Sequence, residues 1–139
     1  MFDLAGRRAS KREQLRIADL MSLTPSGDRV LEIGARDCYL SRRLTGLYRE
    51  VVALDLRRPE VDEPGIVPVE GDATDLSFGD GAFDTVFCTE VLEHIPPEKL
   101  ALACGEIERT SSRYVVIGVP YRQDLRADRT LCRRCGTVN

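Results

Sequence analysis

The chain contains a series of short apolar runs, separated by segments that carry helix or turn signals. The runs occupy residues 29–34, 50–56, 66–70, 83–88 and 113–119. The run at 50–56 is almost continuously apolar, which is typical of strands buried on both faces of a parallel sheet. Alternation of such runs with helical segments indicates right-handed βαβ units. The sequence therefore predicts an α/β, three-layer, Rossmann-like fold with a mostly parallel sheet.

Helices are predicted between these strands, over about 10–23, 38–47 and 97–108. Ser10 and Glu13 fit a capping box at the start of the first helix, in which a hydroxyl and a carboxylate satisfy free backbone N–H groups. Pro68 lies inside the third run. Because proline cannot donate a ladder hydrogen bond, this strand is expected at an edge of the sheet.

The length of 139 residues corresponds to one domain. Within it we distinguish an N-terminal helix (1–27), a core of sheet and helices (28–120) and a tail rich in arginine and cysteine (121–139). No window approaches the roughly 18 consecutive apolar residues of a spanning helix, and the first residues lack the charge order of a signal peptide. We therefore expect a cytoplasmic protein without a membrane partner.

The net charge of −3 conceals a marked asymmetry along the chain. Residues 1–49 sum to +4, residues 50–108 to −12 and residues 109–139 to +5. An acidic middle disfavours a polyanion at a site built from that part, although either basic arm could contact an RNA backbone. A nucleic acid is therefore not the expected partner.

The five cysteines do not suggest a disulfide framework, since the number is odd and three of them are scattered. Cys132 and Cys135 form a C-x-x-C pair that resembles half of a zinc knuckle. Tetrahedral zinc needs four ligands, and no second pair follows. A reduced, fraying tail is the alternative interpretation, and we predict no zinc site.

Acidic residues stand at the ends of three predicted strands, where parallel sheets bind their ligands. Glu32 closes the first strand, Asp55 follows Gly34 by 21 residues, and Asp72 follows the third strand. Asp55 is well placed to accept ribose hydroxyls, and Asp72 to accept an adenine amino proton. Only the first glycine of a G-x-G-x-x-G loop is present, which argues against pyrophosphate. The pattern favours a nucleoside that carries an amino acid instead of phosphates.

These residues lie in four stretches that follow one another in a familiar order. They are V-L-E-I-G-A-R-D at 30–37, V-A-L-D-L at 52–56, E-G-D-A at 70–73 and F-D-T-V-F-C-T-E-V-L-E-H-I-P at 83–96. In this order they resemble the class I S-adenosylmethionine-dependent methyltransferases, in particular the small-molecule group with a Leu-Glu-His step after the fourth strand. Each stretch is weak evidence alone, and together, spread in this order across about 30–120, they are strong evidence.

The resemblance implies S-adenosylmethionine as cofactor, with S-adenosylhomocysteine as product. Glu32 and the backbone of Gly34 would lie by the methionine moiety, Asp55 would hold the ribose, and Asp72 with Ala73 would read adenine. The full set of cofactor-binding residues that it implies is Glu32, Gly34, Ala35, Asp55, Leu56, Asp72, Ala73, Cys88 and Thr89. The family's loop is commonly E-x-G-x-G-x-G, whereas this chain has Arg36 and Cys38 at the second and third glycine positions.

Glu90, Glu93 and His94 are the predicted catalytic residues. At i, i+3 and i+4 they would share one face of a helical turn, and His94 is a candidate general base. The same E-x-x-E-H run is similar to the metal-binding step of RNA 3′-terminal ribose methyltransferases and of some quinone-precursor O-methyltransferases. A divalent metal is a weaker alternative that our assignment leaves out, because His94 is the only histidine. A role in helix capping or packing is the other alternative.

The function predicted is methyl transfer from S-adenosylmethionine to an oxygen or nitrogen atom of a small molecule. The alternatives are an RNA methyltransferase and a non-catalytic cofactor-binding or regulatory module. The resembling fold has seven strands, and this chain accounts for five. We therefore expect a C-terminally short chain lacking the last two strands, or a homodimer that covers the exposed edge of the fifth strand.

Overall fold

The computed structural model describes residues 11–120, which form one sheet of five strands with helices on both faces. The elements in chain order are α2 (Lys11–Leu23), β1 (Gly27–Ile33), α3 (Tyr39–Leu44), β2 (Tyr48–Asp55), β3 (Ile66–Glu70), β4 (Phe83–Thr89), the single 3-10 turn η1 (Leu92–His94), α4 (Pro97–Thr110) and β5 (Ser111–Gly118). The α/β class and the alternation of strands and helices are thus confirmed.

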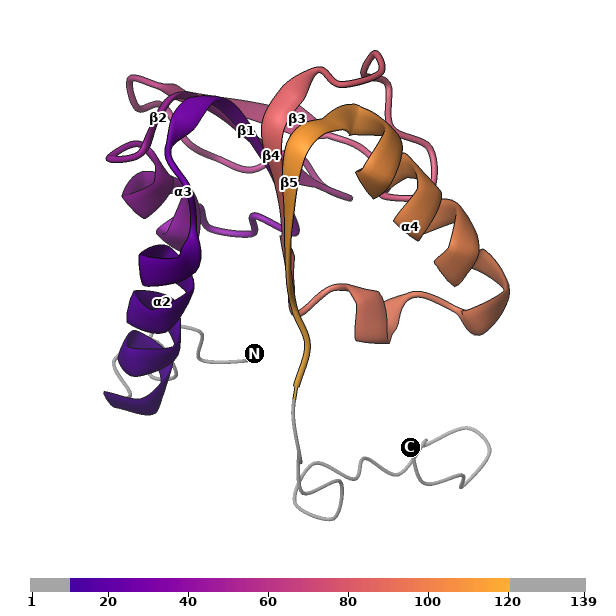
Figure 1. Cartoon of the computed structure of the whole chain (residues 1–139), viewed down its shortest axis with the longest axis horizontal. Helices are drawn as coiled ribbons and strands as arrows, with labels where there is room; N and C mark the ends of the chain where they lie inside the picture. Colours follow the sequence, from indigo (N-terminus) through magenta and orange to yellow (C-terminus); the bar gives the residue numbers. More distant parts are fainter. Residues whose placement is uncertain (1–10, 121–139) are drawn as a thin grey trace.

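The strands lie in the order β3-β2-β1-β4-β5, and every neighbouring pair is parallel. In Figure 1 the sheet is seen nearly edge-on, with α2 and α3 on one face and α4 on the other. The chain crosses from one side of β1 to the other between β3 and β4. This change of direction opens a crevice at the carboxyl ends of the strands, where ligands bind on doubly wound sheets.

Alternate residues of β1 supply the two halves of the core, because successive side chains of a strand point to opposite faces. Leu31 and Ile33 pack with Ala103 and Ile107 of α4. Val30 packs on the other face with Ile17 of α2 and with α3. Both faces of β1 are therefore buried, as the parallel sheet requires.

The observed boundaries refine the predictions at several places. β3 covers the predicted residues 66–70 and is an edge strand, as Pro68 indicated. α3 is shorter than predicted, because Cys38 takes a left-handed conformation before it and a turn follows Leu44. α4 runs on to Thr110, and β5 begins at once at Ser111. Ser10 of the predicted capping box, and the Cys132 and Cys135 pair, lie outside the described residues.

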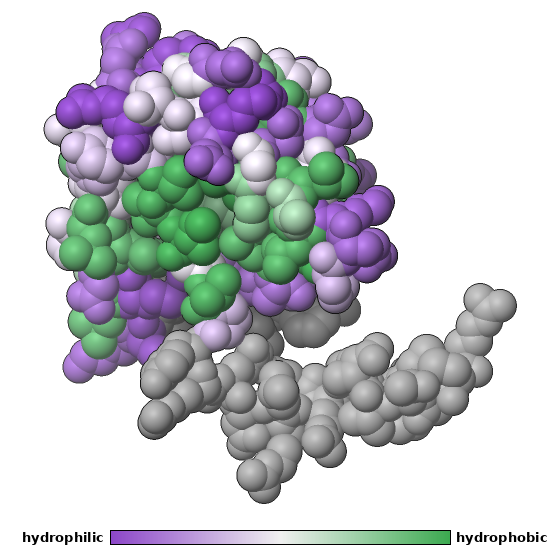
Figure 2. Space-filling view, turned by 45° about the vertical axis from the view of Figure 1, so that its right-hand side comes forward, coloured by the Kyte–Doolittle hydropathy of each residue, from purple (hydrophilic) through white to green (hydrophobic). Residues whose placement is uncertain are grey.

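β5 forms the other edge of the sheet and carries large apolar side chains that remain exposed. Tyr114, Val115 and Ile117 are each more than two-fifths exposed, and Leu102 of α4 is 59% exposed. Figure 2 shows the apolar area over this side of the molecule. None of the helices within residues 11–120 has the length and apolar character needed to cross a membrane.

Candidate functional site

A pocket of about 300 Å³ opens at the carboxyl ends of β1, β2 and β3. Its walls come from the segments that follow these strands, from the segment around η1, and from the first turn of α4. Seven of the predicted site residues line it, namely Gly34, Asp55, Leu56, Asp72, Ala73, Glu90 and His94. The structure thus brings together residues that lie up to 60 positions apart in the sequence.

Gly34 directly follows β1 and lines this pocket, and two features require a glycine there. Its φ of +82° lies in the left-handed region, which L side chains rarely adopt. A Cβ atom at this position would lie 2.4 Å from Cγ2 of Val91. The absence of a side chain therefore lets the segment after β4 approach the end of β1 and form one wall of the pocket.

The carboxylate of Asp55 ties the loop after β1 to the end of β2. Its Oδ2 accepts a hydrogen bond of 2.9 Å from the backbone N–H of Arg36, and its Oδ1 accepts one of 2.8 Å from the N–H of Leu56. An ionised carboxylate offers about four acceptor positions. Two of them remain for hydroxyl groups of a ligand in the pocket.

Asp72 is oriented by the residue two positions further on. Its Oδ1 accepts hydrogen bonds from the N–H (2.9 Å) and the hydroxyl (2.8 Å) of Thr74, and these bonds lower the pKa of the Asp72 carboxyl below its usual range. Among the described residues, no donor reaches Oδ2 of Asp72. This oxygen is the one available to an amino group of a ligand.

The loop between Gly34 and α3 adopts glycine-like backbone conformations without glycine. Arg36 has φ of +49° and Cys38 has φ of +60°. These are the two positions at which the resembling family commonly has its second and third glycines. The side chain of Cys38 is fully buried beside Ala35 and Ala53, while Arg36 is exposed and lines the pocket. The arginine at position 36 therefore adds a cation to the lining of the pocket.

The three predicted catalytic residues do not share a helical face, and that prediction is wrong. Glu90 has φ of +58° and precedes η1, which is a single turn. Glu90 lies 3.8 Å from Arg16 of α2, whereas Glu93 lies 3.9 Å from the imidazole of His94. Glu90 and His94 line the pocket, and Glu93 does not. A left-handed residue before the turn breaks the i, i+3, i+4 spacing on which the prediction depended.

Four of the predicted cofactor-binding residues do not line the pocket. Glu32 is buried, and its carboxylate accepts a hydrogen bond from the hydroxyl of Ser41. Ala35 and Cys88 are buried as well, and Thr89 is half-buried. Burial raises the pKa of the Cys88 thiol to about 12, so this sulfur remains protonated near neutral pH.

Nine further lining residues were not among the predicted site residues, and they include Thr74, Val91, Pro96 and Lys99. Thr74 could have been found from the D-x-T spacing, since an aspartate commonly accepts hydrogen bonds from the residue two positions on. Val91 is recognisable only from its contact with Gly34. Lys99 adds a second cation and contributes to the lowered pKa of Asp72.

The pocket offers hydrogen-bond acceptors of the kind that bind the hydroxyl and amino groups of a nucleoside, and the cations Arg36 and Lys99 also line it. Carboxylate oxygens of Asp55 and Asp72 face it, and their hydrogen bonds to backbone N–H groups hold them in place. Within residues 11–120, no three histidine, cysteine or acidic side chains gather in a way that could hold a metal ion.

Three comparisons place this architecture among known proteins. A family model described as "Methyltransferase domain" matches residues 31–113, which is more than half of the chain. A ubiquinone biosynthesis O-methyltransferase from Xanthomonas axonopodis pv. citri is 32% identical over 96 residues, which cover 61% of this chain and 40% of that protein. The chain therefore spans about two-fifths of the length of that curated relative.

Solved structures agree in fold. The N-methyltransferase NodS from Bradyrhizobium japonicum WM9, in complex with S-adenosyl-L-homocysteine, superimposes with a TM-score of 0.71 at 17% identity, over 80% of this chain and 63% of that one. The PH0226 protein from Pyrococcus horikoshii OT3 gives a TM-score of 0.63 at 23% identity, over 78% of this chain and 58% of that one. At these identities the likeness concerns the fold.

Proposed function

Because the chain belongs to the class I S-adenosylmethionine-dependent methyltransferase family, we propose that it binds S-adenosylmethionine in this pocket and transfers the methyl group to a small-molecule acceptor. The observation that carries the proposal is the convergence of Gly34, Asp55 and Asp72, from three strand ends, on one pocket. The curated relative and NodS, named as an O- and an N-methyltransferase, support oxygen or nitrogen as the acceptor atom.

In the proposed complex, different residues of this chain bind different parts of the cofactor. Asp55 accepts hydrogen bonds from the ribose hydroxyls with the two acceptor positions that Arg36 and Leu56 leave open. Oδ2 of Asp72 accepts the adenine amino group. The backbone at Gly34, which lines the pocket, accommodates the methionine part. The bound cofactor supplies an electrophilic methyl group, and the protein supplies the binding and the alignment.

The acceptor is proposed to enter beside His94 and Glu90. The side chain of His94 is 69% exposed and lines the pocket. A neutral imidazole there can take the proton that an acceptor hydroxyl loses as its oxygen forms the new bond to carbon. Glu90 lies near Arg16, and that contact would bring α2 to the acceptor side of the pocket. The acidic character of residues 50–108 favours a small acceptor over a polyanion.

A ligand panel tests the cofactor. Thermal unfolding of the full chain is measured in the presence of each of four compounds: S-adenosylmethionine, S-adenosylhomocysteine, adenosine triphosphate and oxidised nicotinamide adenine dinucleotide. A ligand that binds only the folded state stabilises it by about 2.7 kcal/mol at a hundredfold excess over its Kd. We expect the first two compounds to raise the Tm and the two phosphate compounds to leave it unchanged. A shift with the phosphate compounds alone would refute the proposal.

An assay of S-adenosylhomocysteine formation with phenolic and amine acceptors tests the transfer. The His94→Ala variant should lose turnover on phenolic acceptors and keep its affinity for S-adenosylhomocysteine. Prior treatment of the wild type with a chelator should leave its turnover and its affinity unchanged. Cofactor binding without turnover on any acceptor would favour a non-catalytic binding module. Steeply salt-dependent RNA binding with turnover would favour an RNA methyltransferase.

We further propose that two copies pair through β5. Its outer edge has no neighbouring strand among the described residues, and its centre, Val115 to Ile117, is apolar and uncharged. Such an edge invites pairing with an identical strand about a two-fold axis. Light scattering after size-exclusion chromatography should give twice the chain mass. Ile117→Pro, which removes an N–H that points away from β4, should give the monomer. A wild-type chain that is strictly monomeric would contradict this.

A further inference from the structure

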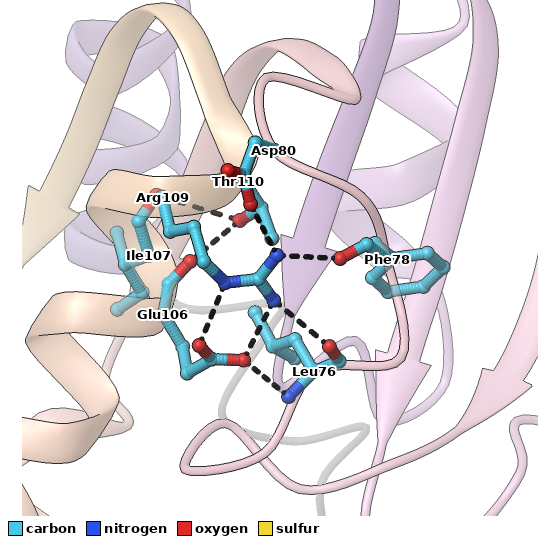
Figure 3. Close-up of polar contacts among 7 residues, drawn as sticks. All are labelled: Leu76, Phe78, Asp80, Glu106, Ile107, Arg109 and Thr110. Carbon is cyan, nitrogen blue, oxygen red and sulfur yellow. Dashed lines mark hydrogen bonds and ion pairs between the residues drawn. The ribbon is translucent and has the colours of Figure 1, made fainter.

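Arg109, near the end of α4, holds the segment that follows β3. Its guanidinium donates hydrogen bonds to the carbonyl oxygens of Phe78 (2.7 Å) and Leu76 (3.0 Å), and it contacts the carboxylate of Asp80 at 3.0 Å. Figure 3 shows these acceptors arranged around the guanidinium nitrogens of Arg109. One side chain thus fixes three positions of an irregular segment.

Glu106 completes the arrangement from the preceding turn of α4. Its two oxygens accept hydrogen bonds of 2.8 Å from Nε and Nη2 of Arg109, and Oε2 also accepts one of 2.7 Å from the backbone N–H of Leu76. The bonds from Arg109, followed by that from Leu76, lower the pKa of Glu106 to about 2. The carboxylate is therefore charged at every physiological pH, and its hydrogen bonds are charge-assisted.

The residues held in this way lie next to the pocket wall. Asp72, Ala73 and Thr74 line the pocket, and Leu76 is buried in the core two residues after Thr74. Between them, Asp72 and Asp75 form an isolated bridge, in which the N–H of Asp75 donates to the carbonyl oxygen of Asp72 at 3.1 Å. The tight turn at 72–75 is thus attached to α4 at Leu76.

From this geometry we propose that Glu106 and Arg109 are positioning residues for the base of the ligand. By holding Leu76 in place, they fix the positions of Asp72 and Ala73. The inference rests on the proposed function, because it takes the pocket beside Asp72 as the adenine subsite. Neither side chain lines the pocket, so the pair acts through the backbone of residues 72–76. Loss of the pair should affect recognition of the base more than that of the remainder of the ligand.

Glu108 provides a matched control for Glu106. It lies on the same helix and is exposed, and its side chain makes no hydrogen bond or ion pair to the described residues. Glu106→Gln and Glu108→Gln make the same chemical change, remove the same charge and alter the same helix. Only the first replaces a charge-assisted acceptor of Leu76 and Arg109 with a neutral one.

Two measurements on the full chain test the proposal. Hydrogen exchange, without ligand, reports the order of residues 71–78. Calorimetry gives the affinity for S-adenosylhomocysteine and for its inosine analogue, in which a carbonyl replaces the adenine amino group. For Glu106→Gln we expect faster exchange in this segment, roughly tenfold weaker binding of S-adenosylhomocysteine, and a smaller preference for it over the inosine analogue. Glu108→Gln should match the wild type.

The outcomes separate this inference from the proposed function. If the wild type binds S-adenosylhomocysteine and Glu106→Gln keeps both its affinity and its preference for adenine, the positioning role is wrong. The same conclusion follows if exchange in residues 71–78 is unchanged in Glu106→Gln. If the wild type binds neither compound, the proposed function fails, and the adenine role of the pair fails with it, whatever the exchange result.

Discussion

The backbone N–H of Arg36 donates a hydrogen bond of 2.9 Å to Oδ2 of Asp55. The two residues are 19 positions apart, and the bond joins the loop after β1 to the end of β2. Arg36 takes a left-handed conformation in this loop, with φ of +49°. The loop is therefore shaped by Asp55 as well as by its own sequence, and the same carboxylate faces the pocket.

Replacement of Gly34 by alanine should destabilise the chain by about 2–4 kcal/mol, because the new Cβ combines left-handed strain with overpacking against Val91. Gly105→Ala on α4 is the control, since a Cβ there would meet nothing within 4 Å. In a helix this change should stabilise by roughly 0.5–1 kcal/mol. Urea unfolding measures both, and equal effects of the two changes would contradict the close approach at Gly34.

Replacement of Arg36 by glycine should leave the free energy of unfolding unchanged or raise it by up to about 1 kcal/mol. Relief of left-handed strain offsets the larger chain entropy of glycine. Arg36→Ala removes the same side chain and keeps the strain, so it should give no such gain. Chemical denaturation compares the two variants. If Arg36→Gly were clearly less stable than Arg36→Ala, backbone strain at φ of +49° would not lower the stability of the wild type.

Acid should remove the stabilisation that Glu106 provides. Its pKa is about 2 in the folded chain and ordinarily 4.5, so the contribution is complete above the ordinary value and is lost as the pH falls from there toward 2. Unfolding in urea between pH 6 and pH 3 should show the wild type losing stability more steeply than Glu106→Gln. Parallel pH curves for the two proteins would argue against the charged pair.

The cysteines within residues 11–120 should differ sharply in their reactivity. Cys104 is exposed, whereas Cys88 is fully buried with a pKa of about 12, and burial raises the pKa of Cys38 as well. Because the thiolate is the reactive form, iodoacetamide at pH 8 should modify Cys104 first. Peptide mass spectrometry of native and urea-unfolded protein measures this. Equal labelling of Cys88 and Cys104 in the native protein would contradict the packing of β4.

The sequence predicts the strands and the strand ends at which the pocket forms, since both depend on local signals. Apolar runs locate β1 to β5, and the acids that follow them, Asp55 and Asp72, mark the carboxyl ends where the pocket forms. The boundaries of β3 and its place at the edge follow from the run at 66–70 and from Pro68.

The remainder depends on contacts that sequence spacing does not reveal. The predicted helical face of Glu90, Glu93 and His94 is wrong because Glu90 takes a positive φ. Its N–H donates to the carbonyl oxygen of Gly118, 28 residues away, at 2.8 Å. The contact of Arg109 with Leu76 and Phe78 likewise joins two elements 31–33 residues apart. A single sequence shows both partners but not that they meet.

Isothermal titration calorimetry of the full chain with S-adenosylhomocysteine tests the central claim most directly. The account predicts binding of one ligand per chain in the wild type, at least tenfold weaker binding in Asp55→Asn, which replaces a charged acceptor by a neutral amide, and unchanged binding in Asp62→Asn on an exposed loop. Absence of binding to the wild type, or equal affinity in wild type and Asp55→Asn, would contradict it.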